Sequence, residues 1–338
     1  MTIVATLGRA GDSVSIDATA PFGASCSVLH LDNGHFVVSG LVGGGELGVY
    51  DAQGKWIRAV GRPGQGPGEF RRQLDLATVA GDTFEVFDRF NLRATKATSA
   101  GKFLGSFRTP EAANGLIAMG RDRWLVLETP GSADVRDSLF VLVDDSGAVV
   151  RAFGASSPAL ADLDAWTAAR GRDGDLFTAS VWHYEIYHWT NRGKLEETFL
   201  RHAPWFPDAQ VVTPRRLDRM FGELPPVDYL EHIAVDDRGR LWTFSLIPDP
   251  DWTPGPTHFT SPAWTRHTFD TMVEVVDVRD PVRARVVASR RFDSVVAPIC
   301  GRDLLLYRMI ETAVGDTRAE ILAPRVTVAG HTPETDRN

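Results

Sequence analysis

Asp75, Asn114, Glu231 and Asp293 have oxygen-donor side chains that could bind a hard cation. Each stands at the start of a short apolar run that is typical of a β-strand. Ca²⁺ takes six to eight oxygen ligands, mainly carboxylate and carbonyl oxygens. If these strands converge, the four residues form a candidate calcium site. The alternative, which the sequence favours, is a ring of polar side chains that are solvated or salt-bridged.

Glu231, His232 and His183 are the candidates for acid–base catalysis. Glu231 and His232 are neighbours in one predicted strand, where successive side chains point to opposite faces. We therefore expect only one of them to face the centre on which the strands converge. His183 lies at a turn and is the better-placed histidine. The sequence has neither a Cys/His spacing typical of zinc sites nor a Gly-x-Ser-x-Gly nucleophile motif, so it contains no complete catalytic constellation.

Aromatic and basic side chains are candidates for ligand binding. Two long segments, 202–229 and 247–271, are rich in prolines, which stiffen loops, and in rings with polar edges, which suit concave ligand sites. The candidates are Trp205, Trp252, His258, Trp264 and His267 in these segments, with Arg71 and Trp166 outside them. The two segments form either a lid over a ligand or a plug of rings packed on each other, and the sequence leaves both open. The Arg71 guanidinium could bind a carboxylate or phosphate, or pair with neighbouring acids.

Short strands separated by tight polar turns must position all of these residues. One kind of hairpin recurs along the chain, for example over 28–38 and 233–243, and the repeat interval is roughly 40 to 60 residues. Four strands per unit at this interval are typical of a β-propeller, in which four-stranded sheets surround a central channel. We predict an all-β, six-bladed β-propeller, with a β-sandwich as the alternative. The stretches with helical character are Pro214–Phe221 and a short turn near Ala159–Ala165.

The first residues of the chain have the sequence pattern of the fourth strand that the last unit lacks. The final unit lacks a clear fourth strand, whereas Ile3–Gly8 has the pattern of the fourth strands at Trp56–Gly61 and Val149–Gly154. A ring closed by the N-terminal strand has no open sheet edge. We therefore predict one propeller domain over residues 1–330 that the N-terminal strand closes, followed by a polar tail over 331–338.

Almost all of the long connections of the predicted propeller lie on one face. In each four-stranded unit, the first and third turns lie on one face, and the second turn and the crossover to the next unit lie on the other. Turns of the first class are nearly all tight, whereas the second class contains the long connections 61–72, 129–137, 156–166, 202–229 and 247–271. Functional loops usually gather in this way on a rigid scaffold. We therefore expect a small-molecule or peptide ligand at this face, over the mouth of the central channel.

The composition excludes some classes of partner. The net charge is −8 and the Lys and Arg residues are scattered, so no basic stripe for nucleic acid is present. No apolar run approaches the length of a membrane span, and the first residues lack the pattern of a signal peptide. We expect a monomer that binds neither nucleic acid nor a membrane.

The two cysteines are predicted to be free, mostly buried thiols. Cys26 lies near the start of one predicted strand, and Cys300 lies at the end of the neighbouring one. A rise of about 3.3 Å per residue separates them by roughly 20 Å, whereas a disulfide needs about 6 Å between Cα atoms.

The segment Gly61-Arg-Pro-Gly-Gln-Gly-Pro-Gly-Glu-Phe70 resembles a hallmark of bacterial six-bladed propellers related to NHL repeats, and the resemblance covers essentially the whole chain. It implies the fold far more than a function, and it implies export, because most members of that group are exported or lipid-anchored. We expect segment 61–70 to form a tight crossover between two units, in which the Glu69 carboxylate accepts hydrogen bonds from backbone N–H groups. The Asn114-Gly pair resembles the element with which six-bladed lactonases hold calcium.

Two hypotheses of function follow. The leading one is a propeller that binds a ligand or partner under an aromatic-rich cap over the channel. The alternative is a calcium-dependent hydrolase or lyase of the lactonase or strictosidine-synthase-like kind, acting at the channel mouth.

Overall fold

A computed structural model describes most of the chain. The described residues are 1–8, 26–39, 45–71, 74–109, 113–120, 123–128, 138–155, 166–206, 226–253, 268–279, 284–301, 303–311 and 317–326. Over these residues the secondary structure consists of strands β1 to β26, without a helix. The stretches Pro214–Phe221 and Ala159–Ala165, expected to have helical character, lie outside the described residues. In the described part of the chain, no helix is long and apolar enough to cross a membrane.

Four antiparallel sheets have four strands each, in chain order or its reverse. The first contains β8 (Leu74–Ala80), β9 (Thr83–Asp88), β10 (Arg93–Thr98) and β11 (Phe103–Arg108). The second contains β12 (Ala113–Gly120), β13 (Arg123–Glu128), β14 (Ser138–Asp144) and β15 (Val149–Ala155). The third contains β16 (Trp166–Arg170), β17 (Leu176–Ser180), β18 (Glu185–Trp189) and β19 (Leu195–Leu200). The fourth contains β20 (Tyr229–Val235), β21 (Leu241–Pro248), β22 (Phe269–Asp277) and β23 (Arg285–Phe292).

The remaining strands form an eight-stranded sheet and a short ribbon. One half of the large sheet contains β2 (Val28–His30), β3 (Phe36–Val38), β4 (Leu47–Tyr50) and β5 (Trp56–Val60). The other half contains β24 (Val296–Gly301), β25 (Leu305–Glu311), β26 (Thr317–Ala323) and β1 (Thr2–Leu7). Parallel pairing of β2 with β24 joins the two antiparallel halves. The ribbon pairs β6 (Arg62–Pro63) with β7 (Glu69–Phe70).

The N-terminal strand completes the sheet made by the last strands of the chain. β1 pairs antiparallel with β26, with Leu7 opposite Ala319 and Ile3 opposite Leu322. Ala5 and Leu7 are buried and pack in one cluster with residues of β24 to β26 and of β2 to β4. The predicted pairing of the N-terminal strand with the last unit is therefore confirmed.

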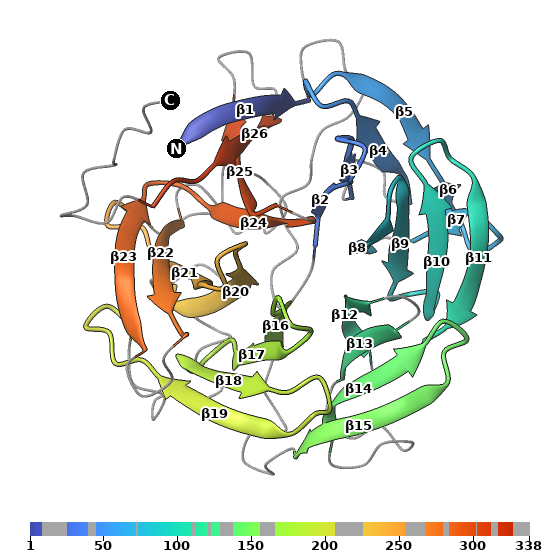
Figure 1. Ribbon diagram of the computed structural model, residues 1–338. Helices are drawn as coiled ribbons and strands as arrows, with labels where there is room; N and C mark the ends of the chain where they lie inside the picture. Colours follow the sequence, from blue (N-terminus) through green and yellow to red (C-terminus); the bar gives the residue numbers. More distant parts are fainter. Residues whose placement is uncertain are drawn as a thin grey trace, which may run out of the picture.

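The sheets stand around a common centre, with the first strand of each innermost (Figure 1). β2, β8, β12, β16, β20 and β24 lie toward the middle, and β1, β5, β11, β15, β19 and β23 lie outside (Figure 1). The hydrophobic clusters each join neighbouring sheets: Leu29 and Val37 pack with Leu76 and Phe84, for example. Outer strands such as β19 are largely exposed. The hydrophobic core therefore lies between neighbouring sheets, and the inner strands line the centre of the molecule.

One tight turn recurs in seven hairpins. Its first residue donates its N–H to the carbonyl four residues later, and a glycine three residues later donates back to the first carbonyl, as in Asp51–Lys55 and Asp236–Arg240. The glycines have positive φ, for example +80° at Gly54 and +73° at Gly239. This geometry, a type I turn followed by a left-handed residue, needs glycine at that position. The seven turns begin at Leu31, Asp51, Thr98, Asp144, Gly171, Thr190 and Asp236.

The Gly/Pro-rich segment forms the crossover between β5 and β8. Oε2 of Glu69 accepts the N–H groups of Gln65 and Gly66, at 3.0 and 2.8 Å. Oε1 of Glu69 pairs with Arg62 at 2.8 Å. The structural role predicted for Glu69 is confirmed.

Cys26 and Cys300 form a disulfide, with their Cα atoms 5.9 Å apart. The prediction of two distant free thiols was therefore wrong. It assumed that the two neighbouring strands run side by side with their starts aligned. Instead β2 pairs with the end of β24, with Leu29 opposite Cys300, which brings the segment before β2 to that cysteine.

Candidate functional site

A β-bulge in β20 sets the directions of Glu231 and His232. Leu230 pairs with Ser245 of β21 and His232 pairs with Phe244, so that Glu231 is an extra residue in the ladder. Nε2 of His232 lies 3.8 Å from Oε1 of Glu231. The expectation that these side chains face apart fails, because the alternation of a regular strand does not hold across a bulge.

Two tyrosines interact with the buried side chain of Glu231. The Tyr229 hydroxyl hydrogen-bonds to Glu231, and burial together with this carboxylate raises the pKa of Tyr229 well above its ordinary value. Burial, and then the charge of Glu231, raises the pKa of Tyr307 in β25 to about 12. Tyr307 also shares a side-chain hydrogen bond with Ser27, directly before β2. Both phenols therefore keep their protons near neutral pH, and the cluster joins β20, β25 and the start of β2.

His232 is neutral near physiological pH. Burial lowers its pKa from 6.5 to about 4. Because the imidazole is uncharged at neutral pH, the 3.8 Å approach of its Nε2 to Oε1 of Glu231 is not an ion pair. The cluster offers a buried carboxylate, phenolic donors and an uncharged imidazole. Such a set can accept a hydrogen bond or a positive charge from a ligand and can donate a hydrogen bond back.

The four predicted calcium ligands have different surroundings. Asp75 in β8 is buried, and this burial raises its pKa to about 8, with Arg89 opposing the shift. Glu231 is also buried, whereas Asp293 is exposed after β23. Asn114 lies in β12, and its side chain is outside what the structure describes. In the described part of the chain, Asp75, Glu231 and Asp293 do not form a group whose ligand atoms lie within 4.8 Å of one another.

A different trio does come within that distance: Asp175, His188 and Glu196. His188 in β18 stacks on Phe177, with ring centroids 4.6 Å apart. Its Nε2 lies 3.2 Å from Asp175 and its Nδ1 lies 4.0 Å from Glu196, so that each ring nitrogen faces one carboxylate. The sequence analysis missed this trio. The pairing of Phe177 with His188 across the β17–β18 hairpin brings it together, and a register assignment for that hairpin would have found it.

Two groups of rings occupy the region where aromatic candidates were predicted. Trp205 packs on Tyr184 and Phe206, with ring centroids 5.8 and 5.9 Å apart. Trp182 packs on Tyr229, the partner of Glu231, at 5.8 Å. In the described part of segment 202–229, Trp205 and Phe206 belong to the hydrophobic cluster between the third and fourth sheets.

The other predicted ligand-binding residues are scattered. Trp166 is buried at the start of β16, and its indole Nε1 has no hydrogen-bond partner among the described residues. His183 and Trp252 are half-buried, and Arg71 is exposed. The backbone N–H of Arg71 donates to Asp88 at 2.9 Å. His258, Trp264 and His267 lie outside the described residues.

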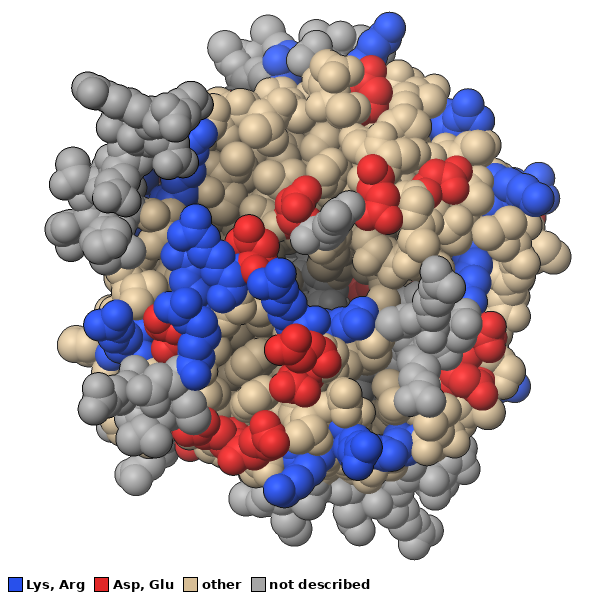
Figure 2. All heavy atoms as spheres, viewed as in Figure 1, with Lys and Arg blue, Asp and Glu red and all other residues tan. Residues whose placement is uncertain are grey.

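The face of the molecule shown in Figure 2 is hollowed at its centre, with acidic and basic side chains around the opening. The inner strands that carry Asp75, Trp166 and Glu231 meet around this centre (Figure 1). The structure thus joins Glu231, His232, Tyr229 and Tyr307 into one site near the centre.

No protein-family model and no curated protein sequence matches the chain. Solved structures do match it over almost its whole length. A protein of Bacteroides fragilis assigned as exported has 11% identity and a TM-score of 0.55, and the match covers 93% of this chain and 95% of that one. A DUF4221-family protein of Bacteroides vulgatus has 10% identity and a TM-score of 0.58, with 95% and 97% covered. Virginiamycin B lyase of Staphylococcus aureus has 12% identity and a TM-score of 0.47, with 90% and 96% covered. The chain has a β-propeller fold.

Proposed function

We propose that the chain is a six-bladed β-propeller that binds a small molecule or peptide at the central site around Glu231. The count of six comes from the four four-stranded sheets and the two halves of the eight-stranded sheet. The relation to NHL-repeat propellers stays a prediction.

The bulge at Glu231 is the observation that carries the proposed binding function. Bulges recur next to functional sites, where they redirect a side chain. Here the bulge brings Glu231 and His232 to one side, although burial of a carboxylate and an imidazole is costly. A site made for stability alone would place apolar side chains there. Hydrogen bonds between both groups and a polar ligand would offset this free-energy cost of burial.

The chemistry of the cluster indicates the kind of ligand. Glu231 is a hydrogen-bond acceptor, and the neutral His232 and the Tyr307 hydroxyl add one polar group each. A ligand with an amine or amide donor fits Glu231, and the packed rings of Trp182 and Tyr229 form the apolar surroundings of this carboxyl group. Small amines and short peptides are therefore the ligand classes to test.

The alternative function is a calcium-dependent hydrolase or lyase at the same mouth. It requires that a cation bind Asn114 together with carboxylates such as Asp75 and Glu231. Elemental analysis and melting curves with and without CaCl₂ test it. Bound calcium and a calcium-dependent rise in Tm would support the alternative over the binding protein.

The disulfide supports an oxidising compartment. Disulfides persist mainly in secreted and periplasmic proteins, because the cytosol keeps thiols reduced. The Cys26–Cys300 bond thus agrees with export of this chain.

A matched pair of variants tests the binding site. Glu231→Gln removes the charge at nearly constant shape, and Asp237→Asn does the same at the exposed turn at the other end of the β20–β21 hairpin. A thermal-shift screen of amines and di- and tripeptides is run on the wild type and both variants. We expect the amines and peptides that stabilise the wild type to act equally on Asp237→Asn and at least tenfold more weakly on Glu231→Gln. Equal binding by Glu231→Gln would place the ligand elsewhere.

A further inference from the structure

A second cleft, away from Glu231, lies at the edge where the N-terminal strand meets β23. It has a volume of about 630 Å³ and is lined by residues of β1, β22, β23, β25 and β26 and by the bend after β23. This volume is in the range of small-ligand pockets. The lining residues are Met1, Ile3, Asp270, Arg290, Arg291, Phe292, Asp293, Arg308 and Leu322.

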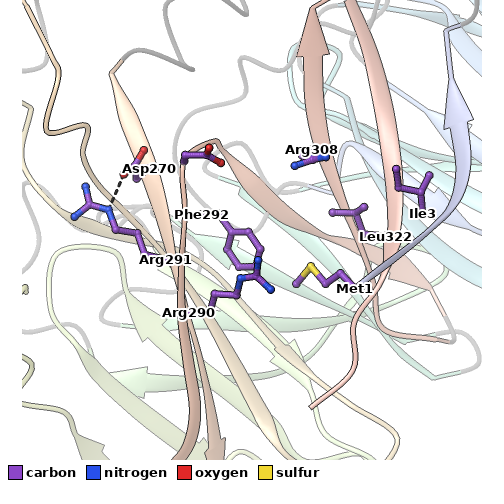
Figure 3. A pocket seen from close by; sticks show the side chains of 9 residues that line it. Met1, Ile3, Asp270, Arg290, Arg291, Phe292, Arg308 and Leu322 are labelled. Carbon is purple, nitrogen blue, oxygen red and sulfur yellow. Dashed lines mark hydrogen bonds and ion pairs between the residues drawn. The ribbon is translucent and has the colours of Figure 1, made fainter. Parts of the chain in front are cut away.

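One wall of the cleft is apolar. Met1, Ile3 and Leu322 come from the paired strands β1 and β26, and Phe292 faces them from the end of β23 (Figure 3). Met1 and Ile3 are 43% and 51% exposed. They present apolar surface to the cleft that a ligand could cover.

Three arginines line the cleft, and they differ in their partners. Arg291 pairs with Asp270 at 2.6 Å, and Arg308 pairs with Glu320 at 2.8 Å. Arg290 makes no ion pair within the described residues, and its guanidinium lies 4.8 Å from the ring centroid of Phe292. Figure 3 shows Arg290 beside Phe292 and Met1, whereas Arg291 points away toward Asp270. Arg290 therefore has no carboxylate partner among the described residues and lies directly beside the apolar wall, while Asp293 also lines the cleft.

We propose that this cleft binds a small amphipathic anion, with a carboxylate head at Arg290 and an apolar chain along Met1, Ile3 and Leu322. A guanidinium fits a carboxylate with two parallel hydrogen bonds. The hydrocarbon chain removes the exposed side chains of β1 from water, which gives the ligand its apolar driving force. Because the cleft lies between β23 and the closing strand β1, the bound ligand contacts two neighbouring sheets at once.

Three probes distinguish the contribution of the carboxylate head to binding from that of the hydrocarbon chain. Octanoate has both, acetate has the head alone, and octylammonium has the chain with the opposite charge. We expect isothermal titration calorimetry to detect one octanoate per chain and a rise of Tm with octanoate concentration. Acetate and octylammonium should give neither. Binding of acetate or octylammonium as tight as that of octanoate would overturn the proposal.

Variants locate the site. Arg290→Gln should weaken octanoate binding at least tenfold, whereas Arg285→Gln, an exposed arginine at the other end of β23, should leave it unchanged. Ile3→Ser should weaken octanoate binding and reduce the gain in affinity from hexanoate to octanoate, which tests the apolar wall if Arg290→Gln fails to fold. The NMR signal of the Met1 methyl group, assigned with Met1→Leu, should shift on addition of octanoate. Unchanged affinity in both Arg290→Gln and Ile3→Ser, or an unmoved Met1 signal at saturation, would refute the site.

Discussion

Buried carboxyl groups near the inner strands are held in the protonated form. Glu85 in β9 is fully buried, and its carboxyl oxygens have no hydrogen-bond partner among the described residues. Burial raises its pKa to about 8, with Lys96 lowering it and Asp145 raising it further. Asp75 in the neighbouring strand β8 has the same raised pKa for the same reason. Protonation lets each group be buried without an uncompensated charge.

The stability of the protein should fall as pH rises because of Glu85. The unfolded chain releases this proton near pH 4.5, whereas the folded protein keeps it up to about pH 8. The contribution to stability is therefore complete below pH 4.5 and is lost as pH rises toward 8. Glu85→Gln cannot ionise, so its free energy of unfolding should increase relative to the wild type from pH 5 to pH 8, by at most about 1.4 kcal/mol per pH unit.

Urea unfolding at several pH values measures this difference. Glu197→Gln, in the outer strand β19, controls for the substitution itself. A Glu85→Gln difference that does not change between pH 5 and pH 8 would show that Glu85 is not held protonated.

At the scale of the elements, four third-turn glycines show that β1 occupies the place of an outer strand. A Cβ atom at Gly101 would contact Val60 of β5. A Cβ atom at Gly147 would contact the carbonyl oxygen of Arg108 in β11, and one at Gly193 would contact the ring of Phe153 in β15. At Gly54 it would meet the carbonyl of Thr6 in β1, at 2.4 Å. Each of these turns thus packs on the outer strand of the neighbouring set of four strands, and β1 is that strand for the turn between β4 and β5.

Gly54 and Gly239 form a matched pair for testing this contact. Both have positive φ in the same turn, but a Cβ at Gly239 has open space around it. Gly239→Ala should cost about 1 kcal/mol, from backbone strain alone. Gly54→Ala should cost about 2 to 4 kcal/mol, because its methyl group also displaces β1. Urea unfolding gives both values, and equal losses would show that β1 does not rest on this turn.

Local patterns made much of the fold predictable, whereas the site depends on register. A glycine three residues after the start of a tight turn, as in Asp51–Gly54, encodes its own geometry, and Ile3–Gly8 shares the pattern of outer strands. The bulge at Glu231 depends on how Leu230 and His232 pair with β21. The local sequence contains no signal for the extra residue in this pairing. The disulfide likewise depends on the parallel pairing of Leu29 with Cys300, between segments at opposite ends of the chain.

At the scale of the whole molecule, two further interactions accompany the joining of the two halves of the eight-stranded sheet. β1 pairs with β26 at the outer edge, and Cys26 bonds to Cys300 beside the inner pairing of β2 with β24. The cysteines are 274 residues apart in sequence. Hydrophobic packing between the two halves, from Leu7 and Ile321 to Phe36 and Tyr50, lies between these two interactions. The ring is thus held at its inner and outer sides by independent interactions.

Removal of the disulfide should lower the stability of the entire ring. A disulfide that closes a long loop restricts the unfolded chain, and loss of a native one typically costs about 2 to 5 kcal/mol. We expect Cys26→Ala/Cys300→Ala to lose this amount in urea unfolding and to keep the far-UV spectrum of the wild type, because β1 still pairs with β26. In the presence of dithiothreitol, the free energy of unfolding of the wild type should fall to that of the double variant. Dithiothreitol should not change the value for the double variant, which shows that the loss comes from the missing bond and not from the alanine side chains. Thiol titration of the denatured, unreduced wild type should find no free thiol. Two titratable thiols per chain, or a double variant as stable as the oxidised wild type, would show that the two halves of the sheet join without this bond.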